Sequence, residues 1–532
     1  MLSSSDLNFS SFFPWTLGRW PSIAVSSVTV VFLALLCFRF WAFTVKPWLR
    51  PDEPRELPYW IPYFGHALEF VNNGQSLTTR ARIYFKNRRE PFALTLGGEK
   101  LYFLTSPDDV QTFYKNTTSL KFESVVYDLG IMFGVSKQAM DRAYEKPESE
   151  AEDVVSRALG TRNSRLKCLA DLNKEFWKMQ LHPGEHYLEL QDVFLEQIQH
   201  RLGFAGIPPT SVRAESAEEK TVSLLELLQR VLVEAALTAF FGAVLLESEP
   251  SIVQDFLDFD DENWKLWYKW PNADQMFAAK GRMAKAIERY LGLPNEQRSD
   301  ASFIIKTFIT SQRALDTSDE DLAKILCMLV FVMNTNTYKA SFWALAFLLQ
   351  DKDFVSQIKD ETTNAFSDSG TLDSQYLAES CPRLSSLVNE VLRFCSASSS
   401  MRVTSTPTII NAKLIPANSR VMVPTHELHF NDAVFGSLTS QFLPDRFLGK
   451  DNLEKSPSFR PFGGGITHCP GRFIAAQEVK MVVAILLRNY DLDVIGETSV
   501  PELETKKPTT GIMGPKGEGD ILLRLLRKGE CM

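Results

Sequence analysis

The stretch FGGGITHCPGR, residues 462–472, is the most specific segment of this 532-residue chain. Its glycines let the backbone turn back on itself, and Cys469 then comes shortly before an amphipathic helix that the apolar spacing predicts from Ala475 to Asn489. Backbone N–H groups in such a turn point at a thiolate, and the positive end of the helix dipole lowers the pKa of the thiol. The segment therefore predicts one activated cysteine at the start of a helix.

Three kinds of site compete for this pattern. A phosphate-binding loop would end in Lys-Ser or Lys-Thr, which is not present here. A cysteine nucleophile needs a histidine base, and His468 is adjacent in sequence, which normally points it away. A thiolate in an apolar cage with an open opposite face suits a haem iron, and the spacing Phe-x-x-Gly-x-x-x-Cys-x-Gly is specific for that use. Cys469 is therefore the predicted metal ligand.

The segment resembles the haem-binding loop of cytochromes P-450, and two further signatures of that family occur upstream in the right order. These are Glu390-x-x-Arg393 and Phe442-Leu443-Pro444-Asp445-Arg446-Phe447. The resemblance covers the chain after its N-terminal anchor. It implies a mainly α fold with a minor β subdomain and one haem b (iron protoporphyrin IX). It also implies cofactor-binding roles for Phe462, Gly463, Gly465 and Gly471, and a buried charge network of Glu390, Arg393 and Arg446 that holds the haem loop.

A narrower likeness is carried by LRFCSAS, residues 392–398, by Met401-Arg402 and by the segment around Asn336. These segments are similar to those of the family branch that contains cholesterol 7α-hydroxylase and prostacyclin synthase. The likeness implies that Arg402 contacts a haem propionate. Because this branch contains both hydroxylases and isomerases, it leaves the reaction type open.

The long apolar helix predicted from Asp319 to Gln350 departs from the family pattern at Asn334-Thr335-Asn336-Thr337-Tyr338. Most monooxygenases of the family carry an acid and an alcohol there, which relay protons, whereas this segment has no carboxylate. Buried polar residues need partners, so they either satisfy one another in the core or bend the helix and line a cavity. We expect the second, with Asn336 and Thr337 as the catalytic residues nearest to oxygen or substrate.

Two other family positions are also changed. Thr467 stands where many members have a basic residue for a haem propionate, and position 181, four residues after Trp177, is leucine instead of arginine. Haem binding is therefore expected to depend on Arg402, with Lys178 or His182 as further candidates.

The N-terminus predicts a membrane anchor. Residues 22–45 are apolar enough for one spanning helix, residues 1–21 form a short luminal end, and residues 46–66 form a proline-spaced linker. Residues 67–532 are then the haem-thiolate catalytic domain. Positive charge is heavier after the anchor than before it, which places this domain in the cytosol and indicates a single-pass protein of the endoplasmic reticulum membrane. Asn8-Phe9-Ser10 is a luminal glycosylation sequon, which occurs often by chance.

Composition narrows the remaining possibilities. The formal net charge of −8 argues against a nucleic-acid partner, and seven scattered cysteines without a CxxC pair indicate reduced thiols. Apolar spacing predicts further helices from Val222 to Leu246 and from Leu384 to Arg393, and a hairpin within residues 92–104 around Gly97-Gly98.

These observations predict a haem-thiolate monooxygenase that oxidises a lipophilic molecule such as a sterol, terpenoid or polyketide, as in secondary metabolism, using O2. The resemblance implies electrons from NADPH through a cytochrome P-450 reductase, docked near Cys469 on Arg460, Arg472 and Lys480. Segments 125–170 and 208–235 are the expected determinants of specificity. Two alternatives remain open: a reductase-independent isomerase or dehydratase on the same scaffold, and a haem-containing binder without turnover.

Overall fold

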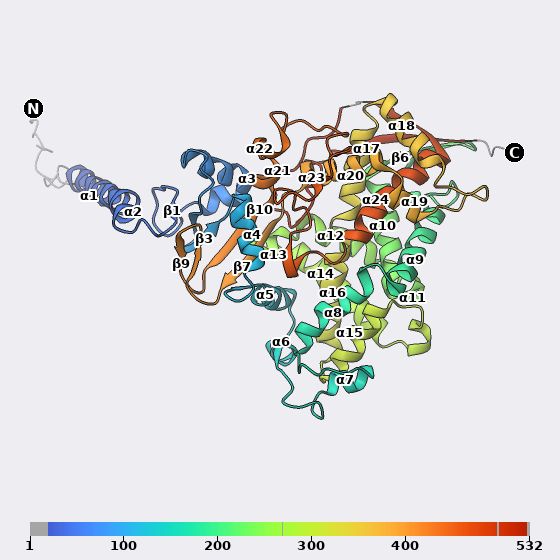
Figure 1. Ribbon diagram of the computed structural model, residues 1–532, viewed down its shortest axis with the longest axis horizontal. Coiled ribbons are helices and arrows are strands. Elements are labelled where there is room, and N and C mark those ends of the chain that lie inside the picture. Colours follow the sequence, from blue (N-terminus) through green and yellow to red (C-terminus); the bar gives the residue numbers. More distant parts are fainter. Residues whose placement is uncertain (1–19, 269, 497–498, 529–532) are drawn as a thin grey trace, which may run out of the picture.

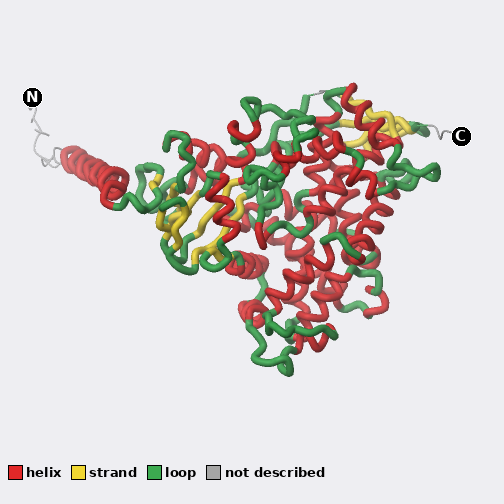
Figure 2. The backbone as a smooth tube through the Cα atoms, viewed as in Figure 1, coloured by secondary structure: helices red, strands yellow, loops and turns green. Residues whose placement is uncertain are grey.

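The computed structural model describes residues 20–268, 270–496 and 499–528. The Asn8 sequon and Cys531 lie outside this part of the chain. Figure 1 shows an N-terminal helix standing clear of a large helical body, with a sheet between the two, and Figure 2 shows that helix dominates. The fold is mainly α with small sheets, as the sequence predicts.

The N-terminal helix is one nearly continuous rod. Helix α1 (Trp20–Phe40) runs through a π-helical turn (Trp41–Val45) into α2 (Lys46–Leu49). A window within Ser27–Leu49 has a mean hydropathy of 2.2, and none of that window is buried. Its length and composition fit one crossing of a bilayer.

The sheet next to the anchor is assembled from distant parts of the chain. Its strand order is β1-β2-β3-β10-β7-β4, and the predicted hairpin around Gly97-Gly98 forms its β2–β3 pair. Both glycines have positive φ (+61° and +85°), which the turn requires and which glycine adopts without strain. The strands are β1 (Arg55–Glu56), β2 (Phe92–Leu96), β3 (Glu99–Phe103), β4 (Leu120–Lys121), β7 (Ser399–Thr404) and β10 (Arg420–Pro424).

Two smaller sheets complete the β component. One has the order β11-β12-β6-β5, and the other is the β8–β9 hairpin. Their strands are β5 (Val212–Glu215), β6 (Glu219–Ser223), β8 (Thr408–Ile410), β9 (Lys413–Ile415), β11 (Tyr490–Ile495) and β12 (Leu522–Arg527).

The rest of the described chain is mostly helical. The helices are α3 (Ala67–Tyr84), α4 (Pro107–Lys115), α5 (Glu123–Phe133), α6 (Lys137–Tyr144), α7 (Val154–Leu159), α8 (Leu169–Leu181), α9 (Glu185–Arg201), α10 (Leu224–Phe241), α11 (Ala243–Ser248), α12 (Ile252–Glu262), α13 (Trp264–Tyr268), α14 (Asp274–Leu291), α15 (Phe303–Ala314), α16 (Asp319–Asn334), α17 (Thr337–Leu348), α18 (Lys352–Thr363), α19 (Ser374–Glu379), α20 (Pro382–Cys395), α21 (Thr425–His429), α22 (Asp432–Phe435), α23 (Asp451–Glu454) and α24 (Arg472–Asn489).

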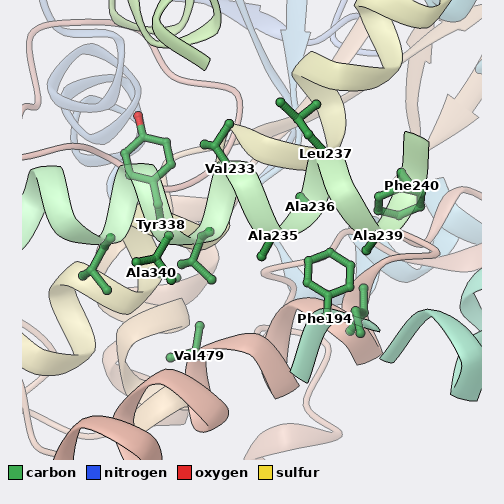
Figure 3. Packing of buried hydrophobic residues seen from close by; sticks show 14 of the residues in the cluster. Phe194, Val233, Ala235, Ala236, Leu237, Ala239, Phe240, Tyr338, Ala340 and Val479 are labelled. Atoms are coloured by element: carbon green, nitrogen blue, oxygen red, sulfur yellow. The ribbon is translucent and has the colours of Figure 1, made fainter. Parts of the chain in front are cut away.

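Helices α10, α17 and α24 form the centre of the core. Figure 3 shows apolar side chains of α10 packed among Phe194, Ala340 and Val479, which come from α9, α17 and α24. All three are less than 9% exposed, so removal of their apolar surface from water stabilises this arrangement. The core therefore fixes α17 against α24, the helix that follows the cysteine loop.

Two of the predicted helices are shorter than expected. The prediction from Val222 to Leu246 is wrong at its start, because Val222 and Ser223 belong to β6, and Gly242 (φ +82°) separates α10 from α11. The prediction of one helix from Asp319 to Gln350 is also wrong, because α16 ends at Asn334 and α17 begins at Thr337. The break falls within the polar segment, where a bend was expected.

Candidate functional site

A cavity of about 1190 Å³ lies between the cysteine loop, the break between α16 and α17, and the sheet. Cys469 lines it, and so do the five other predicted cofactor-binding residues and both predicted catalytic residues. The structure thus brings every site residue predicted from the sequence to one cavity. These residues are Phe462, Gly463, Gly465, Gly471, Arg402, Asn336 and Thr337.

The cysteine loop is shaped by glycines in two places. Gly463 and Gly465 have φ values of +72° and +62°, which other residues rarely adopt. A Cβ on Gly465 would also lie 2.8 Å from the carbonyl oxygen of Tyr114. The loop closes where the Cys469 N–H donates to the Phe462 carbonyl over 3.0 Å, and α24 begins at Arg472. This turn presents the Cys469 side chain to the cavity, as predicted.

The electrostatics of Cys469 differ from the prediction. We expected the start of α24 to lower the pKa of the thiol, but burial among protein atoms raises it. The N–H of Gly471 and the charge of Arg472 oppose this effect without overcoming it. The prediction of a lowered pKa is therefore wrong for the chain by itself, and it is a bound cation that would favour the thiolate.

None of the five other described cysteines lines the cavity, and Cys37 is an exposed residue of α1. Cys168, Cys327, Cys381 and Cys395 are buried free thiols, and burial raises their pKa values, that of Cys327 to about 12. None of these four lines the cavity. Cys469 is thus the one cysteine of the described residues that a cavity ligand meets.

Haem fits this donor set. In the described part of the chain, no group of three or more His, Cys, Asp or Glu side chains could hold a bare metal ion. A metal at Cys469 must therefore bring most of its own ligands, as an iron porphyrin does. Arg402 supports this, because it lines the cavity and its buried Nε has no hydrogen-bond partner within the described residues. An unpaired guanidinium N–H is suited to a propionate carboxylate.

Arg402 is held firmly at the cavity wall. Its Nη1 donates to the Phe113 carbonyl over 2.7 Å, and its Nη2 donates to the Thr467 hydroxyl over 3.1 Å. Thr467, where the family often has a basic residue, therefore helps to orient this arginine. Lys178 and His182, the other two candidates, also line the cavity.

The polar segment of the central helix divides between two faces. Asn336 and Thr337 face the cavity. Thr335, Tyr338 and Lys339 instead surround the buried carboxylate of Asp260 on α12: the Tyr338 hydroxyl donates over 2.6 Å, the Lys339 ammonium over 2.7 Å, and the Thr335 hydroxyl donates as well. Figure 3 shows the Tyr338 hydroxyl directed away from Val479 of α24.

Asn336 has a fixed orientation. Its Oδ1 accepts the Ile512 N–H over 2.8 Å, so the amide must direct its Nδ2 donor elsewhere. Glycine at 511 leaves room for this contact, since a Cβ there would lie 1.8 Å from the Asn336 Oδ1 and would displace the amide. The C-terminal loop and the helix break thus lock each other in place at the cavity wall.

Sequence reasoning missed Glu478. This carboxyl lies on α24, lines the cavity and is 5% exposed. Burial raises its pKa to about 8, while hydrogen bonding with the Thr337 side chain opposes the rise. The central helix lacks a carboxylate, but a neighbouring helix supplies one beside Thr337. A signal was visible in the sequence, because Glu478 is the one carboxylate of the helix Arg472–Asn489.

The predicted charge network is present and buried. Arg393 Nε and Nη2 each donate to the Glu390 carboxylate over 2.7 Å, and Arg446 Nε donates over 3.0 Å. Glu390 and Arg393 are 0% exposed. The network holds the segment 429–446, because both arginines also donate to carbonyl groups there.

One part of the predicted reductase face is wrong. Lys480 is 8% exposed, and its ammonium donates to the Ser385 hydroxyl and the Leu377 carbonyl, over 2.8 and 3.2 Å. It therefore anchors α19 and α20 to α24 and cannot dock a partner. Arg460 and Arg472 both remain partly exposed, although the Nε of Arg460 is buried.

Of the two segments expected to determine specificity, one lines the cavity and the other does not. Several residues of the segment 125–170, among them Leu129, Met140 and Tyr144, line the cavity. None of residues 208–235 does so. The wall also includes Trp267 and Tyr268 of α13 and residues 505–512.

Comparison with known proteins identifies relatives that match 90% or more of this chain. The family described as Cytochrome P-450 matches residues 210–523. A cytochrome P-450 monooxygenase, poxD of Penicillium oxalicum, is 25% identical over 92% of this chain and 98% of its own. A 5-beta-cholestane-3-alpha,7-alpha-diol 12-alpha-hydroxylase of Sus scrofa is 22% identical over 90% of this chain and 94% of its own. A cholesterol 7-alpha-monooxygenase of Cricetulus griseus is 24% identical over 92% of this chain and 97% of its own.

Proposed function

The chain belongs to the cytochrome P-450 family and is a haem b-dependent monooxygenase, and from this premise we propose that it oxidises a lipophilic, polycyclic molecule such as a sterol, terpenoid or polyketide. One oxygen atom of O2 enters a C–H bond of the substrate and the other leaves as water, with two protons and two electrons. NADPH supplies the electrons through a membrane-bound reductase. The observation that carries this proposal is the cavity of about 1190 Å³ at Cys469, with walls that include Phe103, Leu129 and Val332.

Haem, when bound, supplies O2 binding and O–O cleavage, which an electron-rich thiolate ligand favours. The Cys469 thiolate would ligate its iron, and the Arg402 guanidinium would hold a propionate. Phe462, Gly463, Gly465 and Gly471 would form the surface on which the ring rests. These assignments follow from the placement of all six residues on one cavity.

The test uses the purified full chain with a cytochrome P-450 reductase, O2 and a panel of sterols, terpenoids and polyketides. Substrate loss should require both NADPH and reductase, and the product should gain one atom of labelled oxygen from O2. Product formation without NADPH would instead establish the isomerase or dehydratase alternative. Absence of any product with a substrate that binds would establish the binder.

Proton supply is assigned to Glu478 and Thr337. The carboxyl holds a proton at neutral pH because burial raises its pKa to about 8. The Thr337 side chain hydrogen-bonds this carboxyl, and both residues line the cavity. Glu478 donates its proton through the Thr337 hydroxyl to the cavity, and the carboxylate then takes up a proton from solvent water. Glu478 thus supplies, from α24, the carboxyl that the central helix lacks.

Replacing Glu478 with glutamine is expected to lower turnover about 100-fold, because the amide keeps the shape but releases no proton. NADPH consumption should fall less than product formation, which the ratio of the two rates measures. Thr337→Val, which keeps the carboxyl, should show the same uncoupling. Full coupling in both variants would exclude this pair as the proton source.

The same variant has a predictable effect on stability. In the unfolded chain the Glu478 carboxyl has its ordinary pKa near 4.5, so between about pH 4.5 and 8 only the folded state holds the proton. Stability therefore falls as pH rises through this window, by up to ~1.4 kcal/mol per pH unit. Denaturant unfolding from pH 5 to 8 should show this slope in the wild type and a smaller slope in Glu478→Gln.

Asn336 is assigned to substrate positioning through its Nδ2 donor. Asn336→Ala removes that donor and the bond to Ile512, so we expect the Kd for substrate to rise about tenfold. Asn334→Ala is the matched control, because the Asn334 side chain donates to the Val330 backbone carbonyl of its own helix and does not line the cavity. Substrate titration followed by haem absorbance measures both. Equal affinities in the two variants would remove this role from Asn336.

Placement in the endoplasmic reticulum membrane is part of the proposal, with the catalytic domain in the cytosol, residues 22–45 as the anchor and residues 46–66 as the linker. Trp60, Ile61 and Phe64, next to the anchor, are 48%, 60% and 57% exposed, which suits contact with a bilayer surface. After washing with alkaline carbonate the full chain should remain in the membrane pellet. Its release into the supernatant would contradict an integral anchor.

A further inference from the structure

The buried charge network does not reach the cysteine loop directly. Within the described residues, the side chains of Glu390, Arg393 and Arg446 form hydrogen bonds with the segment 429–446 and with one another, and none forms a hydrogen bond with residues 460–472. A charge network that holds the haem loop therefore needs an intermediate.

His429 supplies the connection. This residue ends α21 and is 0% exposed. Its Nδ1 lies 2.9 Å from the carbonyl oxygen of Arg393, and its Nε2 lies 3.0 Å from the backbone nitrogen of Arg460. The ring also stacks on Phe459, with centroids 5.5 Å apart. One imidazole thus joins the charge network to Arg460, two residues before the cysteine loop.

The two partners determine the protonation of the ring. The Arg460 N–H can only donate, so Nε2 must carry a lone pair, and the Arg393 carbonyl can only accept, so Nδ1 must carry the proton. Burial lowers the pKa of His429 to about 3, with the charges of Arg393 and His426 acting in the same direction, so the ring stays neutral at physiological pH. Both hydrogen bonds then persist together.

The Arg460 end leads directly to the iron ligand. The Arg460 carbonyl accepts the Gly463 N–H over 3.1 Å, and the neighbouring Phe462 carbonyl accepts the Cys469 N–H over 3.0 Å. A shift of Arg460 would therefore move the turn from which Cys469 extends. Among the described side chains, His429 is the one that connects this turn to Arg393.

We propose that His429 is a positioning residue for the haem ligand, which keeps the Cys469 thiolate in place by tying the cysteine loop to the charge network. It touches neither substrate nor cofactor and acts through Arg460. The inference depends on haem ligation by Cys469 and not on the substrate class.

The test compares His429→Phe with His426→Phe in the purified holoprotein. Phenylalanine keeps the size of the ring and removes both hydrogen bonds. His426, on the same short helix, is the control, because it is a partly buried ring that contacts the Phe430 ring, and its Nδ1 has no partner among the described residues. The readout is the ratio of thiolate-ligated to thiol-ligated CO complex in the reduced protein, together with the thermal midpoint.

We expect His429→Phe to lower that ratio about tenfold, as the loss of two hydrogen bonds implies, and His426→Phe to leave it unchanged. An unchanged ratio in His429→Phe, or an equal fall in both variants, would overturn the proposal. A wild type without the thiolate band would instead overturn ligation by Cys469.

A second pair of variants separates positioning from folding. In His429→Gln the amide oxygen lies where Nε2 was and can accept the Arg460 N–H, whereas the shorter side chain of His429→Asn retains only the bond to Arg393. We expect the glutamine variant to keep most of the thiolate form and the asparagine variant to lose it, even at matched thermal midpoints. The opposite order, or no difference, would show that the contact with Arg460 does not position the ligand.

Discussion

Cys469→Ala is expected to fold normally and to lose all turnover above background. The loop is closed by the backbone bond between Cys469 and Phe462, which alanine keeps, and the lost thiol faces the cavity. The free energy of unfolding of the chain without haem should therefore change by less than ~1 kcal/mol. The iron, however, loses its only predicted protein ligand. Haem content and product formation by the purified variant measure both effects.

Cys395→Ala is the matched control and should behave in the opposite way. Cys395 is 0% exposed and does not line the cavity, so truncation leaves a small void in the core. This should cost about 1–2 kcal/mol of stability while turnover per bound haem is retained. If Cys469→Ala kept its turnover, the assignment of the ligand would be wrong, whatever the control did.

Glu390→Gln should be among the most destabilising single substitutions in the chain. The carboxylate accepts from both Arg393 and Arg446 and from the Leu443 N–H, over 2.7 to 3.1 Å. Glutamine keeps the volume but leaves two buried guanidinium groups without a counter-charge. Breaking a buried ion pair in this way costs about 3–5 kcal/mol. Denaturant unfolding monitored by circular dichroism measures this loss.

An exposed pair provides the comparison for Glu390. Asp445 pairs with Arg383 over 3.2 Å, and these side chains are 48% and 36% exposed. Because solvent screens such a pair, Asp445→Asn should cost less than ~1 kcal/mol. Equal losses of stability in Glu390→Gln and Asp445→Asn would mean that burial does not strengthen the ion pairs of Glu390.

The sequence was sufficient where function depends on a local pattern. The cysteine loop, its glycines and the i, i+3 spacing of Glu390 and Arg393 are contiguous, so their geometry follows from short-range backbone rules. The hairpin around Gly97-Gly98 is predictable for the same reason.

The rest depends on contacts between distant segments. Asp260 and Glu478 each approach the polar break of the central helix from another helix, and nothing in the local pattern near residue 336 indicates either carboxyl. From the sequence alone, the central helix lacks an acid, which kept the isomerase alternative open. The structure supplies a carboxyl, that of Glu478, from another helix. Lys480 and Glu478 lie two positions apart on α24, and both are buried, although charged residues usually indicate an exposed face.

The most direct test of the central claim, that Cys469 holds a haem iron as a thiolate, is the carbon-monoxide difference spectrum of the reduced, purified full chain. The structure predicts a Soret band red-shifted to the position characteristic of thiolate ligation, which disappears in Cys469→Ala. A well-folded wild type that binds no haem, or a band that persists in the alanine variant, would contradict the account.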